Sequence, residues 1–254
     1  MRNKKSRQFS RSSVMYIVFG IALVGVMTLF GASAFLGVNY FVINGAVTYT
    51  PEEIIDASGV SRGNNLLYLN IRTVEQNIRK ELPYISSVEI SRDLPDTLTI
   101  TVTESKPVAY ILFSGDIVII DSSGRVLDII QSHSMDITNL IEVRGVLLSD
   151  AKIGNMLKSE LGVEQYLSAM QNVLASMEKE GIANDINYLD VSNINNISFG
   201  YLGMYRVIVG GVGELRIKLN RLPSDIRDLK ERYPNTRGVY NMTDESRHYI
   251  FTPE

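Results

Sequence analysis

The fold of this chain is decided by residues 84–109, which read YISSVEISRDLPDTLTITVTESKPVA. In residues 97–104 the apolar side chains Leu98, Ile100 and Val102 alternate with threonines, a pattern typical of a strand with one buried face. Residues 87–92 alternate in the same way, and Pro95 and Asp96 suit the turn between the two runs. The stretch therefore predicts a hairpin with strands at residues 87–92 and 97–104.

A helix is predicted to begin at Thr50. Threonine is a favoured N-cap, and Pro51 fits the first helical position, where its missing N–H costs nothing. Glu53 stands three residues after Thr50, so the two residues can form a capping box. Gly59 can end this helix in the left-handed conformation.

A second helix is predicted to begin at Thr73, with Gln76 as its reciprocal capping partner, and to end before Pro83. Residues 38–45 are predicted to form a strand that precedes both helices. Residues 37–106 therefore have the predicted order β-α-α-β-β, which describes a small α+β domain.

The apolar run at residues 14–36 is predicted to be a single transmembrane helix, because it contains 23 residues and no charged side chain. At about 1.5 Å per residue it is roughly 35 Å long, slightly more than a hydrocarbon core of about 30 Å. By the positive-inside rule, the basic residues before it keep residues 1–13 in the cytoplasm and place residues 37–254 outside. These basic residues are Arg2, Lys4, Lys5, Arg7 and Arg11.

The alternative to an uncleaved anchor is a signal peptide, because Ala32-Ser33-Ala34 fits the A-x-A pattern of a cleavage site. The apolar run is longer than the roughly 7–15 residues of a signal-peptide core, which favours the anchor. A basic tail can also indicate nucleic-acid binding, but beside a span it indicates topology, so no nucleic-acid partner is expected. The chain has no cysteine, which excludes disulfides and thiolate ligands.

Residues 107–254 are predicted to form a second α+β domain, rich in strands and with an antiparallel sheet. A hairpin at residues 117–130 is expected to turn at Gly124. Apolar stripes predict one helix from Leu157 to Glu180, capped by Gly181, and another over 215–233 that either kinks or restarts at Pro223. The remaining strands are predicted at 141–146, 186–191, 197–200, 204–210, 238–242 and 247–251.

The 84–109 stretch, together with Thr50-Pro-Glu-Glu-Ile54 and Gly63-Asn-Asn65-Leu-Leu67, resembles the POTRA domain of the FtsQ/DivIB family of bacterial cell-division proteins. One copy directly after a single span is also typical of that family. The predicted order of residues 107–254 is similar to the family's second, β-rich domain, with a weaker match residue by residue. The resemblance covers residues 14 to about 252.

This resemblance implies a non-enzymatic bitopic scaffold at the division septum of the cell membrane, without a cofactor. Its implied partners are membrane-anchored coiled-coil division proteins of the FtsB/DivIC and FtsL types, and indirectly the septal peptidoglycan synthases. Two other functions stay open: a POTRA-type chaperone or docking module for exported polypeptides, and an anchored cell-wall enzyme. The single copy of the domain and the lack of a run of barrel strands argue against the docking module.

The sequence offers few groups for catalysis or metal binding. The two histidines, His133 and His248, have no metal-ligand spacing to another histidine, and there is no cysteine. The glycine-rich residues 210–213 follow a predicted strand as a phosphate loop would, but Arg216 occupies the last glycine position of G-x-G-x-x-G. We therefore predict no catalytic, cofactor-binding or metal-binding residue.

Two Ser-x-x-Lys patterns resemble the nucleophile motif of penicillin-binding enzymes, at Ser149 to Lys152 and at Ser176 to Lys179. The companion S-D-N and K-T-G elements are missing, and a pattern with two fixed positions occurs easily by chance. Ser176 also lies inside a predicted amphipathic helix. Neither serine is predicted to be a nucleophile.

The last predicted strand is the candidate partner-binding site. A terminal strand at a sheet edge offers backbone N–H and C=O groups to which a partner segment can add. Arg247, Tyr249 and Phe251 are of types common at interfaces, although Tyr249 and Phe251 could instead pack in the core. Arg92, at the end of a predicted strand, either supports the first domain or contacts a partner.

Overall fold

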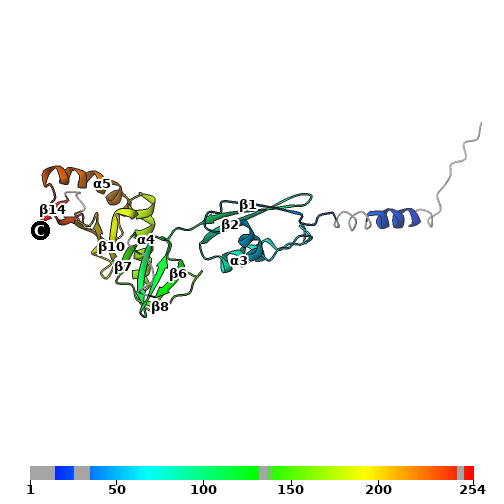
Figure 1. Cartoon of the computed structure of the whole chain (residues 1–254), viewed down its shortest axis with the longest axis horizontal. Coiled ribbons are helices and arrows are strands. Elements are labelled where there is room, and N and C mark those ends of the chain that lie inside the picture. Colours follow the sequence, from blue (N-terminus) through cyan, green and yellow to red (C-terminus); the bar gives the residue numbers. More distant parts are fainter. Residues whose placement is uncertain (1–14, 26–34, 132–136, 138, 245–248) are drawn as a thin grey trace, which may run out of the picture. The chain divides into compact units, whose positions relative to one another are not determined.

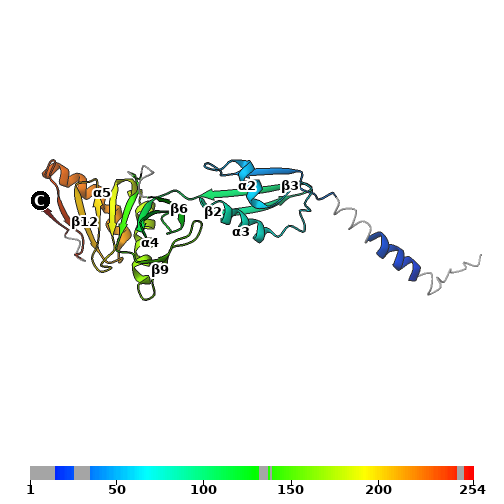
Figure 2. The ribbon, with the colours of Figure 1, turned by 60° about the horizontal axis from the view of Figure 1, so that its bottom comes forward.

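The computed structural model describes residues 15–25, 35–131, 137, 139–244 and 249–254. The chain divides into two compact units (Figures 1 and 2). The first unit comprises Met1–Ile78 and Ser87–Glu104, and the second comprises Arg79–Ser86 and Ser105–Glu254. Both helices and strands occur along each unit, so the α+β class predicted from the sequence is confirmed.

The first unit is built on a three-stranded sheet. The elements in chain order are β1 (Tyr40–Asn44), α2 (Pro51–Ser58), α3 (Ile71–Glu81), β2 (Ile85–Asp93) and β3 (Thr97–Glu104). The sheet order is β1-β3-β2, and β1 runs parallel to β3. This is the predicted β-α-α-β-β order, and Leu98, Ile100 and Val102 of β3 are buried as their alternation requires.

The predicted capping of α2 is confirmed. The Thr50 hydroxyl oxygen accepts a hydrogen bond from the Glu53 N–H (3.3 Å), and the Glu53 carboxylate accepts one from the Thr50 N–H (2.8 Å). Gly59 follows the helix with a left-handed φ of 69°. Both ends of α2 are therefore determined by residues that the sequence alone identifies.

The predicted start of the next helix at Thr73 is wrong. The side-chain oxygen of Asn70 accepts a hydrogen bond from the Thr73 N–H (3.3 Å), so Asn70 caps the helix and α3 begins at Ile71. Asparagine and threonine are both good caps, and the earlier of the two is used here. The helix ends at Glu81, before Pro83, as predicted.

The carboxylate of Glu104 closes the loop between β1 and α2. It accepts hydrogen bonds from the backbone N–H groups of Val47 (2.9 Å), Thr48 (2.9 and 3.1 Å) and Tyr49 (3.4 Å). Burial acts to raise the pKa of this carboxyl, but the hydrogen bonds from Thr48 and from the backbone N–H groups outweigh it, so the pKa lies below its ordinary value. The end of β3 is thereby joined to the segment that leads into α2.

The second unit is built on a nine-stranded sheet. A small pair, β8 (Leu148–Asp150) and β9 (Lys158–Ser159), forms separately, and a 3-10 turn, η1 (Ala183–Asp185), precedes β10. Side by side, the nine strands are β14 (Ile250–Pro253), β13 (Gly238–Asn241), β12 (Tyr205–Gly210), β11 (Ile197–Tyr201), β10 (Ile186–Asp190), β7 (Ile141–Arg144), β4 (Ala109–Phe113), β5 (Asp116–Ile120) and β6 (Val126–Gln131).

This sheet is mixed, whereas an antiparallel sheet was expected. The pairs β4 with β7, β7 with β10 and β12 with β13 run parallel, and the other five run antiparallel. Two of the parallel pairs are joined along the chain through a helix, which is the usual crossover between parallel neighbours, and the third is joined through β5 and β6. Strand β4 was not predicted, because its five residues follow Pro107 and resemble a connector.

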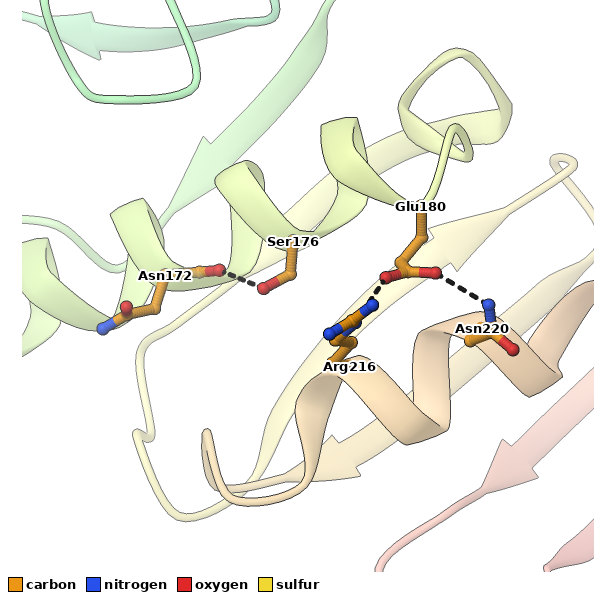
Figure 3. A network of polar contacts seen from close by, with 5 residues as sticks. All are labelled: Asn172, Ser176, Glu180, Arg216 and Asn220. Carbon is orange, nitrogen blue, oxygen red and sulfur yellow. Dashed lines mark hydrogen bonds and ion pairs between the residues drawn. The ribbon is translucent and has the colours of Figure 1, made fainter.

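Helices α4 (Glu164–Lys179) and α5 (Leu215–Arg232) lie side by side in front of the strands (Figure 3). Buried side chains from both helices and from most of the strands form one core cluster. In it, Met170 and Leu174 of α4 and Leu219 and Leu222 of α5 join Phe199 of β11. Helix α5 continues through Pro223, so no new helix starts there.

The predicted start of α4 at Leu157 is wrong. Leu157 is buried, but it lies in the extended segment before β9, and Leu161 is 97% exposed. Gly162 has a φ of 84°, which is incompatible with a right-handed helix. The helix begins two residues later, and Gly181 follows it with a φ of 72°, as predicted.

Glu180 connects the end of α4 to the first turns of α5 (Figure 3). One carboxylate oxygen accepts a hydrogen bond from Arg216 Nε (3.2 Å), and the other accepts one from Asn220 Nδ2 (2.8 Å). These hydrogen bonds, the one from Asn220 first, hold the pKa of the Glu180 carboxyl below its usual value. The two helices are therefore joined by a polar contact as well as by their shared core.

The predicted transmembrane run lies partly outside the described residues. Residues 15–25 are helical, whereas residues 26–34, which include Ala32-Ser33-Ala34, lie outside. Within the described ranges, no helix has both the length and the apolar character that crossing a membrane requires.

Gly45→Ala is expected to destabilise the first unit strongly. Gly45 has a φ of 81°, and a Cβ atom there would lie 2.1 Å from the Val102 carbonyl oxygen, a backbone atom of β3. Gly63 is the matched control, because its φ is 88° and no atom lies within 4 Å of its added Cβ. Gly63→Ala should therefore cost only the left-handed backbone penalty of about 1–2 kcal/mol. Urea unfolding followed by circular dichroism compares the two, and equal losses would contradict the steric argument.

Glu104→Gln is expected to lower the free energy of unfolding by about 1–2 kcal/mol at pH 7, because a charged acceptor of backbone N–H groups is lost. The folded-state pKa of Glu104 is lowered, so its stabilisation is complete above the unfolded-state pKa of about 4.3 and is lost as the pH falls through the folded-state value. The difference between wild type and variant should therefore shrink on acidification in urea titrations. Glu89→Gln, at an exposed position of β2, is the control; a difference for Glu104→Gln that is independent of pH would refute the charge argument.

Candidate functional site

Strand β14 forms one edge of the nine-stranded sheet, next to β13. The predicted last strand was residues 247–251, whereas β14 is Ile250–Pro253. Arg247 lies outside the described residues. Within the described part of the chain, no strand pairs with the outer side of β14, so a sheet edge is available at the C-terminus.

The backbone of Phe251 faces this open edge. In an antiparallel pair, residues alternate between bonding to the neighbour and pointing away from it. The Glu254 N–H bonds to the Arg237 carbonyl oxygen (3.0 Å), and Phe251 stands opposite Tyr240. By this alternation the N–H and C=O of Phe251 point away from β13. Pro253, two residues further on, also turns its backbone away from β13. It has no N–H, which suits an outer strand.

The rings of Tyr249 and Phe251 lie on the helix side of the sheet. Both are partly buried and pack against the core cluster. The Phe251 ring centroid is 5.3 Å from that of Tyr233 and 6.1 Å from that of Tyr205. The Tyr249 ring contacts Tyr240, with the centroids 6.0 Å apart. These side chains therefore follow the core-packing alternative, whereas Ile250 between them is exposed.

A groove lies between α5 and the C-terminal strands. It has a volume of about 310 Å³, and its lining includes Tyr249 and Phe251 together with charged side chains of α5. Asp225 accepts a hydrogen bond from Arg221 Nε (2.9 Å) and another from the Tyr240 hydroxyl (2.7 Å). Burial, followed by the hydrogen bond to Asp225, raises the pKa of Tyr240 above its ordinary value. The groove is thus lined by aromatic side chains and by polar side chains that are hydrogen-bonded to one another.

The sequence did not identify the polar residues of this groove. Arg221 and Asp225 are four residues apart on α5, which is the spacing of a helical ion pair and was the available signal. Arg221 also stacks over the Tyr249 ring, with its guanidinium carbon 5.2 Å from the centroid. Tyr240 bonds to Asp225 across fifteen residues of chain, and no local pattern reveals such a pair.

Arg92, the fourth candidate residue, lies in the first unit. It is at the end of β2, and its guanidinium donates a hydrogen bond to the Leu69 carbonyl oxygen (2.7 Å). The residue is exposed, so this bond does not bury the charge. Arg92 therefore has a structural contact within its own unit and also a solvent-facing side.

The glycine-rich segment 210–213 connects β12 to α5, and its three glycines line a cavity of about 620 Å³. Lys218 also lines this cavity, and its buried ammonium group donates a hydrogen bond to the Val209 carbonyl oxygen (2.6 Å). Among the described residues, no group of acidic side chains or histidines could hold a metal ion. His133 and His248 lie outside these residues.

The two serines of the Ser-x-x-Lys patterns donate hydrogen bonds to backbone carbonyls. Ser176 donates to the Asn172 carbonyl oxygen on α4 (2.7 Å, Figure 3), and Ser149 donates to that of Lys158 (3.3 Å). Lys152 pairs with Asp150 at 2.8 Å. These contacts give each serine an ordinary structural role.

The chain matches a family model and is similar to curated proteins. Residues 36–105 match the family model described as "POTRA domain, FtsQ-type". The chain is also similar to curated proteins named "Cell division protein DivIB". It is 29% identical to the protein of Clostridium tetani over 224 residues, which cover 85% of this chain and 82% of that protein. It is 29% identical to that of Clostridium acetobutylicum over 209 residues, 82% and 80% of the two chains.

A further similarity links the chain to a second set of proteins. It is 32% identical over 109 residues to "Cell division protein FtsQ" of Corynebacterium glutamicum, which covers 43% of this chain and 48% of that protein. The first unit has the element order and the turn residues on which the resemblance was based. The chain therefore has an FtsQ-type POTRA domain at residues 36–105, and over most of its length it is similar to cell-division proteins of the FtsQ/DivIB type.

Proposed function

We propose that this chain is a non-enzymatic, bitopic scaffold of the division machinery. Its similarity to DivIB and FtsQ proteins carries the proposal. Residues 1–13 would form the cytoplasmic tail, 14–36 the single membrane span, 37–106 the POTRA domain and 107–254 the β-rich domain outside the membrane. The uncharged run and the basic tail before it support this topology.

The partners would be membrane-anchored coiled-coil division proteins of the FtsB/DivIC and FtsL types, through which septal peptidoglycan synthases are recruited and regulated. The open edge of β14 supports this role, because an extended partner segment could add to it by main-chain hydrogen bonds. The groove beside it, with Tyr249, Phe251 and Arg221, would supply selectivity. Arg247 and Arg92 remain further candidates for partner contact.

The edge and the groove would select different features of a partner. The Phe251 N–H and C=O would bind the partner's backbone regardless of its sequence, while Ile250 and Thr252 would contact side chains on the helix-free face. On the other face, the aromatic rings are already packed against the core, so little side-chain entropy would be lost on binding. A rigid edge of this kind suits a recruitment platform.

A fluorescent fusion to the full chain is expected to concentrate at the division site of dividing cells of its own species. Depletion of the chain should give filamentous cells, because a scaffold that links partners to septal wall synthesis is then missing. Time-lapse fluorescence microscopy measures both effects. A uniform envelope signal, together with normal division after depletion, would refute the proposal.

Phe251→Pro and Phe251→Ala should separate main-chain from side-chain binding. Both variants lose the ring that packs on Tyr205 and Tyr233, but only the proline variant also loses the outward N–H. Loss of one backbone bond of about 1.4 kcal/mol corresponds to about tenfold weaker binding. We therefore expect Phe251→Pro to bind the coiled-coil partners about tenfold more weakly than Phe251→Ala in biolayer interferometry. Equal affinities of two folded variants would rule out strand addition at this position.

A further inference from the structure

The chain leaves the apolar run and enters the first unit at one end of its sheet. Leu36 and Val38 pair with the loop before α3: the Leu66 N–H bonds to the Leu36 carbonyl oxygen (2.8 Å), and the Gly63 N–H bonds to that of Val38 (2.8 Å). Gly37 forms an antiparallel bridge with Asn65. Continuing this register places Phe35, which lies near the end of the apolar run and is the first described residue after residues 26–34, opposite Leu67.

The turn between β2 and β3 belongs to the same end. The N–H groups of Asn39 and Tyr40 both bond to the Asp96 carbonyl oxygen, at 2.8 and 3.2 Å. Arg92, just before this turn, bonds to the Leu69 carbonyl oxygen. Three segments far apart in the sequence, 35–40, 62–72 and 92–96, therefore meet where the chain enters the domain.

Exposed apolar side chains gather at this end. In residues 35–104, all of which are described, seven large apolar side chains are exposed, and five of them lie in these three segments, each 51–80% exposed. We call these five the N-terminal surface: Phe35, Tyr40, Leu67, Tyr68 and Leu94. Such a concentration exceeds the scattered exposure that is normal for a soluble surface.

We propose that the N-terminal surface rests in the interfacial region of the lipid bilayer, so that the POTRA domain is held against the membrane as well as tethered to it. The inference rests on the proposed membrane span of residues 14–36. That run is continuous with the surface, because Phe35 belongs to both and the run ends one residue later, at Leu36. Two tyrosines and a phenylalanine are side chains that favour the headgroup level, where one part of the ring is apolar and another wet.

The charges around the N-terminal surface indicate what kind of lipid it needs. Residues 61–72 contain Arg62 and Arg72 and no acid, and residues 92–96 contain Arg92 with Asp93 and Asp96. The net charge of these segments is therefore only +1, so strong attraction to anionic lipid is not required. Apolar and aromatic contact carries the docking, and a zwitterionic bilayer is sufficient.

Single tryptophans can test the docking, because the natural chain contains none. The full chain would be reconstituted in phosphatidylcholine vesicles whose acyl chains are brominated close to the headgroup, where bromine quenches tryptophan. Tyr68→Trp probes the N-terminal surface. Val47→Trp is the matched control: its side chain is 89% exposed, and its N–H is bonded to Glu104, seven residues along β3 from Thr97, or about 23 Å away. Phe19→Trp lies in the apolar run and reports insertion itself.

We expect Tyr68→Trp to be strongly quenched and to emit at shorter wavelength than Val47→Trp, whereas Val47→Trp stays unquenched and Phe19→Trp is quenched. If Phe19→Trp is quenched and Tyr68→Trp is not, the docking is refuted while the span stands. If Phe19→Trp is also unquenched, the span itself fails, and the docking fails with it.

A further variant separates docking from mere proximity. Leu67→Ser combined with Leu94→Ser, in the Tyr68→Trp chain, removes two apolar neighbours without changing the tether. Both side chains are exposed, so the fold should persist, which circular dichroism checks. Loss of the quenching supports docking by the apolar surface. Undiminished quenching would mean that the tether alone brings Tyr68 to the bilayer, and it would overturn the proposal.

Discussion

The packing of α4 and α5 against one face of the nine-stranded sheet is the constraint on which the second unit depends. Nine strands spaced about 4.8 Å apart are about 38 Å wide, whereas two helices cover about 20 Å. The sheet is therefore wider than its helical cover. At the β14 edge the rings of Tyr249 and Phe251 extend the core. Near the opposite edge, Ile117, Ile119 and Leu127 alternate with Val118, Ile120 and Val126 of the core and form a small separate cluster on the other face. The strand edge at the C-terminus is exposed because, among the described residues, no strand pairs with the outer side of β14.

Two carboxylates reinforce this architecture at the ends of elements. Glu104 joins the end of β3 to the segment before α2, and Glu180 joins the end of α4 to the start of α5. In each case the donors lie far away in the sequence, so the contact closes a long loop. Both groups have a pKa below the ordinary value, so their contributions are present at neutral pH and weaken together in acid.

The two proposed contact surfaces of the chain use different physical means. At the β14 edge, the N–H and C=O of Phe251 can form hydrogen bonds with a partner, while its ring is already packed against the core. At the N-terminal surface, the backbone is bonded internally and the side chains of Phe35 and Tyr68 are exposed. An exposed strand edge suits a protein segment, and an exposed aromatic end suits the bilayer interface. A scaffold that links the membrane to a division complex needs both.

The sequence by itself determined those parts of the protein that depend on neighbouring residues. The alternation in β3, the capping box of α2 and the family resemblance all follow from short patterns, because the groups concerned lie within a few residues of each other. Only the tertiary structure decided what depends on distant partners. It placed β4 inside a mixed sheet, between β7 and β5. It started α4 after Gly162 despite the apolar stripe from Leu157, and it turned the Tyr249 and Phe251 rings towards the core. Strand order, sheet direction and the choice of buried face are set by contacts across the fold, and a local pattern of side chains contains no record of them.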